Sequence, residues 1–321
     1  MYISHILITA LATTSTAQAL HPANEAQPSP QPTKRLLASA LNWLTSTLNN
    51  PPKSASATCP PVWTEIATTL TAQFLADGQC TDAARAAIRT SFHDCFNGAC
   101  DGSLILAGEC SNSENRGLER VCGNLGNLAQ QKQVGTADLI QFAAAHAIKT
   151  CPGGPTVPVK VGRKDSDVAN AQGILPGGHA SGVDMVKLFA SKGFTPKDLA
   201  ALLGAHTTAR QRTTDPSRAN ATLDSTPGTW DNKYYQETRS GQAPFTLPVD
   251  KSISTTPATA VPFTAFALSK SAWDVAFVSA MQKMSLLGVD KEGLVDCTSA
   301  LPGGSEKREV RRGSVFERLG W

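Results

Sequence analysis

The sequence predicts a mainly α-helical protein in which residues 59–303 fold as one domain of two helical lobes. Apolar residues in this part recur mainly at helical spacing, and long segments that alternate apolar and polar residues, as strands do, are absent from it. Capping patterns mark several helix starts. A chain of 321 residues can bury a substantial core in one large domain or two ordinary ones.

Three predicted helices have capping signals at their starts. In the segment TPKD at 195–198, a threonine N-cap precedes a proline at the first helical position and an acid at the third, and an apolar stripe that includes His206 follows. Residues 271–274, SAWD, repeat the N-cap and the acid at the third position but not the proline, and Thr136 precedes a third stripe. We therefore expect helices to begin at these three points.

The two ends of the chain differ in composition from the part between them. Residues 1–19 lack acidic and basic side chains and end in Ala-Gln-Ala, which predicts a secretory signal peptide. A membrane anchor is the alternative, but the apolar run is short and rich in Thr and Ser. Residues 20–58, rich in Pro, Ser and Thr, predict a flexible linker or propeptide, and residues 304–321 a basic flexible tail. We expect a secreted, extracellular protein that has no membrane contact after signal cleavage.

The formal net charge of +3 is a property of the tails. Residues 20–58 and 304–321 contribute +2 each, which leaves −1 for residues 59–303. The folded part therefore gives little support for a nucleic-acid partner, and we expect none.

Eight cysteines in an exported protein predict four disulfides, because the extracellular space is oxidising. Zinc binding is the alternative use of cysteine. Neither a CxxC pair nor an HExxH helix occurs, which disfavours zinc.

Arg89 and His93 form the first candidate site. They stand four residues apart, so on a helix both side chains project from one face, with Phe92 beside them. A solvated helix face is the alternative for such a pair when it is considered alone.

The sequence after this pair changes that balance. Residues 93–103, HDCFNGACDGS, resemble the distal segment of plant secretory peroxidases and, in part, that of fungal lignin-degrading peroxidases. The similarity extends from about Trp63 to Pro302 and includes CPGGP at 151–155 and GRK at 162–164. The resemblance implies a two-lobed helical fold with one haem b between a distal and a proximal helix. It also implies that hydrogen peroxide is reduced while an organic donor is oxidised in one-electron steps.

The resemblance assigns roles on the distal side. His93 would move a proton from one peroxide oxygen to the other, and Arg89 would stabilise the negative charge that develops as the O–O bond breaks. Phe92 would line the pocket. Asn115, in the segment SENRGL, would accept the second N–H of His93 and fix its tautomer; a loop asparagine in a turn is the alternative.

On the proximal side, the segment LAALLGAHT at 199–207 resembles the helix whose histidine is the axial iron ligand, here His206. The segment LPVD at 247–250 matches the family's partner carboxylate, here Asp250. Arg210 would pair with a haem propionate, and a solvent-exposed arginine is the alternative. Without the resemblance, His206 would be interpreted as a packed core residue.

The resemblance also implies two calcium sites. Calcium prefers about seven hard oxygen ligands, and the matching loops are rich in such oxygens. A glutamate linked to the distal ion through water corresponds to Glu109, and Ala99 stands where the family usually has glycine. An acidic turn before a helix is the alternative for the second loop. The expected distal ligands are the side chains of Asp94, Asp101 and Ser103 and the carbonyls of Asn97 and Ala99, and the proximal ligands are Thr207, Asp224, Thr226, Thr229 and Asp231.

The disulfide pattern implied by the resemblance is mixed. Fungal secreted peroxidases imply the pairs Cys59–Cys297 and Cys80–Cys151, and plant ones imply Cys95–Cys100. The pair Cys110–Cys122 then remains. The chain is thus identified as a divergent member close to the fungal class II, lignin-peroxidase-like enzymes.

Departures from the family predict the donor. The three carboxylate positions of manganese peroxidases hold Asp82, Ala86 and Arg212, and the exposed tryptophan of lignin peroxidases is replaced by Ala201. We therefore expect oxidation of small phenolic and dye-type donors by a monomer, with little oxidation of Mn²⁺ or of non-phenolic aromatics. Two alternatives remain open: a haem or calcium protein without turnover, and a disulfide-rich adhesive protein whose tails carry the function.

Overall fold

The computed structural model describes residues 58–303, and this part of the chain is mainly α-helical, as predicted. The expected signal peptide, nearly all of the expected linker and the basic tail lie outside the described residues. Strands are limited to two short antiparallel pairs within 58–303. They are β1 (Leu75–Ala76) with β2 (Gln79–Cys80), and β3 (Lys160–Val161) with β4 (Val295–Asp296).

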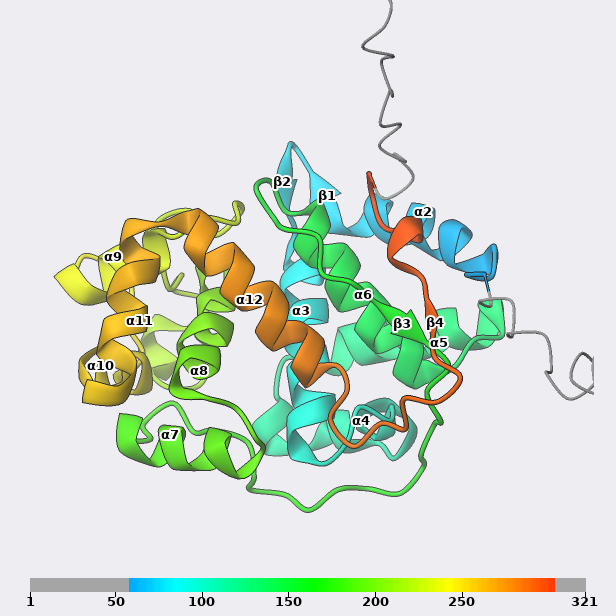
Figure 1. Cartoon of the computed structure of the whole chain (residues 1–321), viewed down its shortest axis with the longest axis horizontal. Coiled ribbons are helices and arrows are strands. Elements are labelled where there is room, and N and C mark those ends of the chain that lie inside the picture. Colours follow the sequence, from blue (N-terminus) through cyan, green and yellow to red (C-terminus); the bar gives the residue numbers. More distant parts are fainter. Residues whose placement is uncertain (1–57, 304–321) are drawn as a thin grey trace, which may run out of the picture. The chain divides into compact units, whose positions relative to one another are not determined.

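The helices form two groups joined by a long helix, α12 (Lys270–Met284), which contacts both (Figure 1). The first group comprises α2 (Val62–Phe74), α3 (Asp82–Asn97), α4 (Ser103–Leu106), α5 (Glu119–Lys132) and α6 (Thr136–Thr150). The second comprises α7 (Gly182–Ser191), α8 (Pro196–Leu203), α9 (Lys233–Ser240), α10 (Pro248–Thr255) and α11 (Pro257–Leu268). This arrangement agrees with the two helical lobes expected from the sequence.

The helix starts agree with the capping signals in one case and differ in two. Helix α8 begins as predicted, with a capping box between Thr195 and Asp198. Helix α12 begins at Lys270 with Ser269 as its N-cap, two residues before the predicted cap Ser271, because the hydroxyl of Ser269 accepts the capping hydrogen bond from the Ala272 amide. Thr136 is the first residue of α6, not its cap, and its amide donates to the carboxylate of Asp165, a residue far along the chain.

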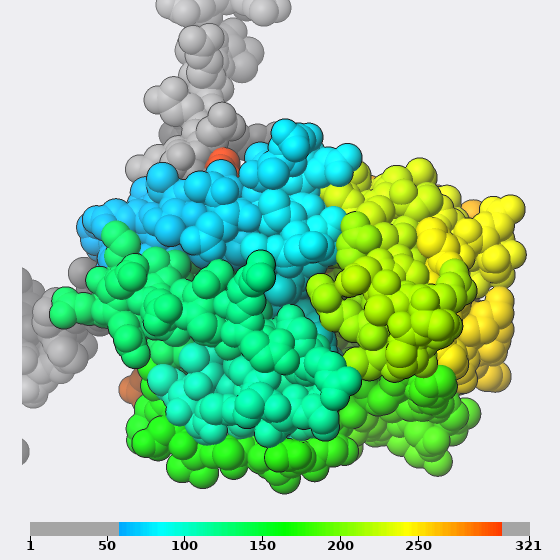
Figure 2. Space-filling view, turned by 180° about the vertical axis from the view of Figure 1, so that it is seen from behind, coloured from blue at the N-terminus to red at the C-terminus, as the bar shows by residue number. Residues whose placement is uncertain are grey.

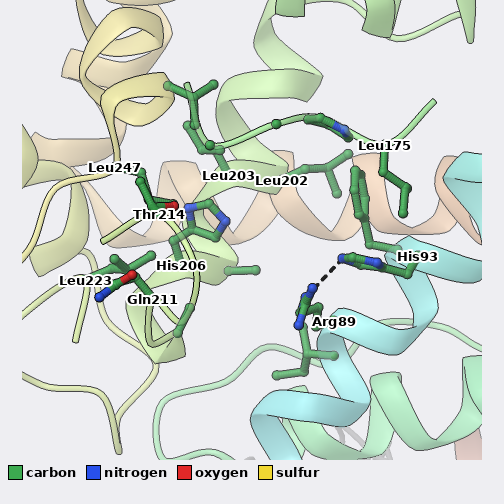
Figure 3. A pocket seen from close by; sticks show the side chains of 18 of the residues that line it. Arg89, His93, Leu175, Leu202, Leu203, His206, Gln211, Thr214, Leu223 and Leu247 are labelled. Atoms are coloured by element: carbon green, nitrogen blue, oxygen red, sulfur yellow. Dashed lines mark hydrogen bonds between the residues drawn. The ribbon is translucent and has the colours of Figure 1, made fainter. Parts of the chain in front are cut away.

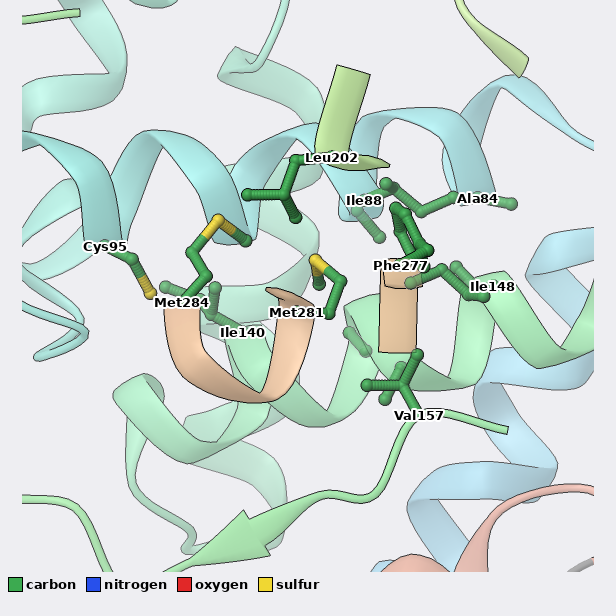
Figure 4. Close-up of a cluster of buried hydrophobic side chains, with 14 of the residues drawn as sticks. Ala84, Ile88, Cys95, Ile140, Ile148, Val157, Leu202, Phe277, Met281 and Met284 are labelled. Carbon is green, nitrogen blue, oxygen red and sulfur yellow. The ribbon is translucent and has the colours of Figure 1, made fainter. Parts of the chain in front are cut away.

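The core between the two groups is apolar and closely packed. Figure 4 shows side chains of α3 and α6 gathered around Phe277, Met281 and Met284 of α12, with Leu202 of α8 beside them. Trp230 stacks on Trp273 with ring centroids 5.1 Å apart, and both are completely buried. Because α12 contacts both α3 and α8, it fixes the distance between the two helices that border the candidate site.

Four disulfides connect all eight cysteines, with the pairing that the resemblance implies: Cys59–Cys297, Cys80–Cys151, Cys95–Cys100 and Cys110–Cys122. The first closes a loop of 238 residues and so ties one end of the described chain to the other. Closing loops restricts the unfolded chain, and a stabilisation of roughly 2–4 kcal/mol per bond is typical.

Candidate active site

A cavity of about 440 Å³ lies between α3 and the segment that follows α8. Its volume falls within the range of roughly 300–1,000 Å³ that is usual for small-molecule and cofactor sites. His93 comes from α3 and His206 from the opposite wall (Figure 3). In Figure 2, which shows the molecule from behind, the cyan part of the chain meets the yellow-green segment after α8 along a seam. The two histidines therefore face one space from the two helix groups.

The distal histidine belongs to a chain of hydrogen bonds. The Nδ1 of His93 is 2.6 Å from Oδ1 of Asn115, and the Asn115 amide nitrogen donates in turn to the carbonyl of Glu109 at 2.8 Å. Arg89 donates from Nε to Nε2 of His93 at 3.0 Å. Since Arg89 can only donate, Nε2 is the acceptor and Nδ1 carries the proton. Burial and the charge of Arg89 lower the pKa of His93 to about 3, against the hydrogen bond to Asn115, which raises it, so the ring is neutral near pH 7.

Arg89 is held by the backbone of the neighbouring loop. Its Nη1 donates to the carbonyl of Arg116 at 3.0 Å, and its Nη2 donates to that of Glu114 at 3.2 Å. Burial and the charge of Arg212 lower the pKa of Arg89 to about 10, which leaves the group charged at neutral pH. Phe92 lines the same cavity. The structure therefore brings together the four residues expected on the distal side.

The proximal pair also meets. Nδ1 of His206 is 2.9 Å from Oδ2 of Asp250, and the Asp250 side chain is 1% exposed. The expected helix ends at Leu203, however, and His206 lies in the 3-10 helix Gly204–Thr208 that continues it. The carbonyl of Ala201, at the end of α8, accepts a hydrogen bond from the indole of Trp273 at 2.9 Å.

Close packing explains why this segment passes through Gly204. A Cβ atom at Gly204 would lie 2.4 Å from the indole of Trp273 and from the hydroxyl of Tyr235, which no side chain tolerates. The ring of Tyr234, edge-on to His206 at 5.7 Å between centroids, completes the wall. His206 is thus positioned by aromatic side chains of α9 and α12.

Arg210 lines the cavity but has protein partners of its own. Its Nη1 donates to the carbonyl of Asn220 at 3.1 Å, and its Nε lies 3.6 Å from the carboxylate of Asp82. The position is compatible with the expected contact to a propionate, which stays a prediction.

The residues of this cavity fit a haem group. Asp250 engages one ring nitrogen of His206, which leaves Nε2 as the only ring nitrogen for a metal ion. The 31% exposed imidazole borders the cavity, whose walls supply the apolar surface that a porphyrin needs. Those wall residues are Ile88, Phe92, Leu175, Met185, Phe189, Leu199, Leu202, Leu203, Leu223, Leu247, Val249, Ile253, Phe277, Met281 and Met284.

Most of the expected distal calcium ligands lie together beside α3. The two oxygens of Asp94 accept from the amides of Gly102 at 3.2 Å and Leu104 at 3.3 Å, and Oδ1 of Asp101 accepts from the amide of Ser103 at 3.1 Å. Oδ1 of Asn97, a buried side-chain oxygen, has no hydrogen-bond partner within the described residues. Such an oxygen would suit a cation. Ala99 follows in the same loop with an ordinary negative φ, so alanine is accommodated there.

Glu109 lies buried near this cluster. Its Oε2 accepts from the side-chain nitrogen Nδ2 of Asn97 at 3.2 Å, and its Oε1 accepts from the backbone amide of Asn170 at 2.8 Å. The Asn170 side chain also donates to the hydroxyl of Ser103 at 2.8 Å. Asn170 was not predicted, because it comes from a long loop with no local motif.

The expected proximal calcium ligands form a second cluster. The hydroxyl of Thr207 donates to Asp224 at 2.5 Å, and that of Thr226 donates to Asp231 at 2.9 Å. The amide of Thr229 donates to the carbonyl of Thr226 at 3.0 Å, which closes the loop.

The charge of these clusters fits calcium. Burial raises the pKa of Asp94 to about 8 and that of Asp224 to about 7, against the hydrogen bonds that each accepts. Neither carboxylate has a basic ion-pair partner in residues 58–303. The same part of the chain holds no group of three or more His, Cys, Asp or Glu residues that could hold a metal ion by themselves. Each site would therefore combine two carboxylates with hydroxyl and carbonyl oxygens, which suits a hard cation.

The sequence did not predict the contacts that fix Arg89 or the aromatic wall behind His206. The carbonyls of Glu114 and Arg116 carry no side-chain signature, and Tyr234 lies in the segment KYYQETRS, which contains no motif. No helix within residues 58–303 is both long and apolar enough to cross a bilayer.

Comparison with known proteins identifies the family to which the chain belongs. Residues 65–269 match the family model described as peroxidase. A low-redox potential peroxidase of Taiwanofungus camphoratus is 32% identical over 260 residues, covering 75% of this chain and 77% of that protein. Manganese peroxidase 3 of Phlebia radiata is 27% identical, covering 71% and 73%, and a peroxidase of Arthromyces ramosus is 27% identical, covering 77% and 80%. The chain therefore belongs to the peroxidase family, in its fungal class II branch, and is a haem-dependent peroxidase that reduces hydrogen peroxide.

Proposed function

We propose that the protein reduces hydrogen peroxide with His93 and Arg89 and oxidises small phenolic donors at the cavity. The observation that carries the proposal is the chain from Arg89 through His93 to Asn115, opposite His206. Binding of a cofactor alone requires none of the three distal residues. A haem or calcium protein without turnover, or an adhesive protein, would not need the arrangement of Arg89, His93 and Asn115.

His93 acts as the proton carrier. Because Asn115 accepts the Nδ1 proton, Nε2 of His93 is unprotonated, and its lone pair, which accepts from Arg89 in this structure, would take the proton from one peroxide oxygen. The same ring then returns this proton to the other oxygen, which leaves as water. Arg89 donates to the oxygen on which negative charge develops, and its guanidinium keeps its charge throughout. One hydrogen peroxide thus takes up two electrons and two protons to give two waters, while two phenols each lose one electron and one proton.

His206 would hold the iron of one haem b through Nε2, and Arg210 would pair with a propionate. When bound, the haem would supply the redox chemistry, namely the two electrons for peroxide that the organic donors replace one at a time. Asp250 accepts the Nδ1 proton of His206 and so increases electron donation from the ring. Two calcium ions would complete the clusters next to the histidines.

The donor is proposed from the residues at the cavity and at the surface. Asp82, at a position that bears a carboxylate in manganese peroxidases, is engaged by Arg85 at 3.1 Å and Arg210 at 3.6 Å. Arg212 at another such position would repel a dication. Ala201 is completely buried, and the three tryptophans within residues 58–303 are at most 3% exposed. These features favour small phenols at the haem edge over Mn²⁺ or bulky donors.

The donor proposal predicts a ranking in steady-state turnover of the purified holoenzyme. A phenol should be oxidised with saturation, whereas Mn²⁺ in a chelating buffer and a methoxylated benzyl alcohol should give little or no turnover. Saturable Mn²⁺ oxidation comparable to phenol oxidation would mean that another carboxylate cluster binds the metal. We also propose that the enzyme is a secreted monomer, which sedimentation of the protein from culture medium would test.

A further inference from the structure

The cavity has an unusually positive rim. Five arginines line it, against a single acidic side chain, that of Glu114. Arg85 and Arg89 come from α3, Arg116 from the loop after it, and Arg210 and Arg212 from the segment after His206. Both lobes therefore contribute positive charge to one opening.

Ion pairs engage only some of these arginines. Asp82 pairs with Arg85 at 3.1 Å and lies 3.6 Å from Arg210. The carboxylate of Glu119 accepts from the amide of Gly117 at 2.9 Å, and its charge acts on Arg89. None of the ion pairs within residues 58–303 involves Arg116 or Arg212.

Arg212 is the rim arginine best placed to meet a ligand. It is exposed, and its Nη1 donates to the neutral side chain of Asn220 at 3.1 Å. Its Cδ would lie 3.0 Å from a Cβ atom at Gly117, so its stem crosses from the proximal segment to the distal loop. Gly117 has a φ of 90°, which a larger residue adopts poorly. Arg212 is thus held across the opening while its guanidinium remains accessible to solvent.

We propose that this rim selects aromatic donors that carry a carboxylate, and that Arg212 is the residue that positions them. The inference rests on the proposed oxidation of phenols at the cavity and names the class of phenol. A guanidinium binds a carboxylate through two parallel hydrogen bonds, which orients the ring that is attached to it. The carboxylate stays at the rim while the phenol end enters the cavity.

The test compares 3-(4-hydroxyphenyl)propionate with its methyl ester, which replaces the charged carboxylate by a neutral group with one additional methyl. The holoenzyme should show a higher kcat/KM for the acid than for the ester. In Arg212→Gln, kcat/KM for the acid should fall by about three- to tenfold, mainly through KM, because the pair is exposed and of moderate strength. In the same variant, kcat/KM for the ester should fall clearly less than that for the acid. Arg239→Gln, which removes an exposed arginine from α9, is the matched control and should alter neither donor.

A binding measurement without peroxide separates this inference from the proposed function. Calorimetric titration of the resting holoenzyme with 3-phenylpropionate should give weaker binding to Arg212→Gln than to the wild type or to Arg239→Gln. Equal binding to all three, or an equal loss of acid and ester turnover in Arg212→Gln, would overturn the role of Arg212. If neither phenol were oxidised while the anion still bound through Arg212, the proposed donor class would fail and the anion site would stand.

Discussion

Replacing His93 with leucine is expected to slow the reaction of the holoenzyme with hydrogen peroxide by at least roughly 100-fold, the lower end of the range for a positioned proton carrier. Leucine has no lone pair to take the peroxide proton, and Arg89 loses the acceptor at 3.0 Å that orients its Nε. Haem should stay bound, because His206 and Asp250 lie on the opposite wall. Stopped-flow absorption of the haem after mixing with peroxide measures the rate constant directly.

The matched control for this substitution is His146→Leu. His146 is also a buried histidine, but it bonds to Thr71 at 2.9 Å and does not line the cavity. Its loss should leave the peroxide reaction unchanged.

In the wild type the rate constant for the reaction with peroxide should stay level from neutral pH to about pH 4. It should fall only as His93, with a pKa of about 3, becomes protonated and can no longer accept a proton. An unchanged rate in His93→Leu would refute its assignment as the proton carrier.

Removal of calcium by a chelator is expected to lower activity and Tm together. Asp94 directly follows His93, and Thr207 directly follows His206, so each expected ion lies next to a cavity histidine. Without the ions, Asp94 and Asp224 are buried carboxylates with raised pKa values of about 8 and about 7 and no basic partner. Loosening the histidines by about 1 Å can cost on the order of 100-fold in rate. The loss of a saturating ligand lowers stability by roughly 3 kcal/mol at 100 times its Kd.

The calcium prediction is checked by Tm and turnover before and after chelation, and again after Ca²⁺ is restored. Asp224→Asn should reproduce part of both losses and respond less to added Ca²⁺. Asp184→Asn, which changes an exposed carboxylate on α7, is its control. Full activity and an unchanged Tm after complete calcium removal would mean that the two loops bind no ion.

Local patterns predicted the fold well where the stabilising contact is close in sequence. The capping box of Thr195 and Asp198 lies within one turn, and the structure contains it. The start of α6 could not be predicted in this way, because its amides bond to Asp165, about 30 residues away. The change to a 3-10 helix before His206 likewise depends on Trp273 and Tyr235, which meet Gly204 only in the folded chain.

The candidate site likewise contains residues that motifs predicted and contacts that no motif could predict. Motifs selected Arg89, His93, Asn115 and the pair His206 and Asp250, and the structure brings each group within hydrogen-bond distance. Contacts made by backbone carbonyls were not predictable, because every residue has one. The ion pair of Arg210 with Asp82 was also missed, since two charged residues on different elements give no signal of proximity.

The central claim is that His206 binds haem iron in this cavity. The absorption spectrum of the reconstituted protein tests this claim most directly. Titration of the folded protein with haem should give a Soret band that saturates at one haem per chain. His206→Gly should lose this band or bind haem weakly, and added imidazole should restore it, because the removed ligand is then supplied from solution. A wild-type protein without a Soret band, or a His206→Gly spectrum identical to that of the wild type, would contradict the account.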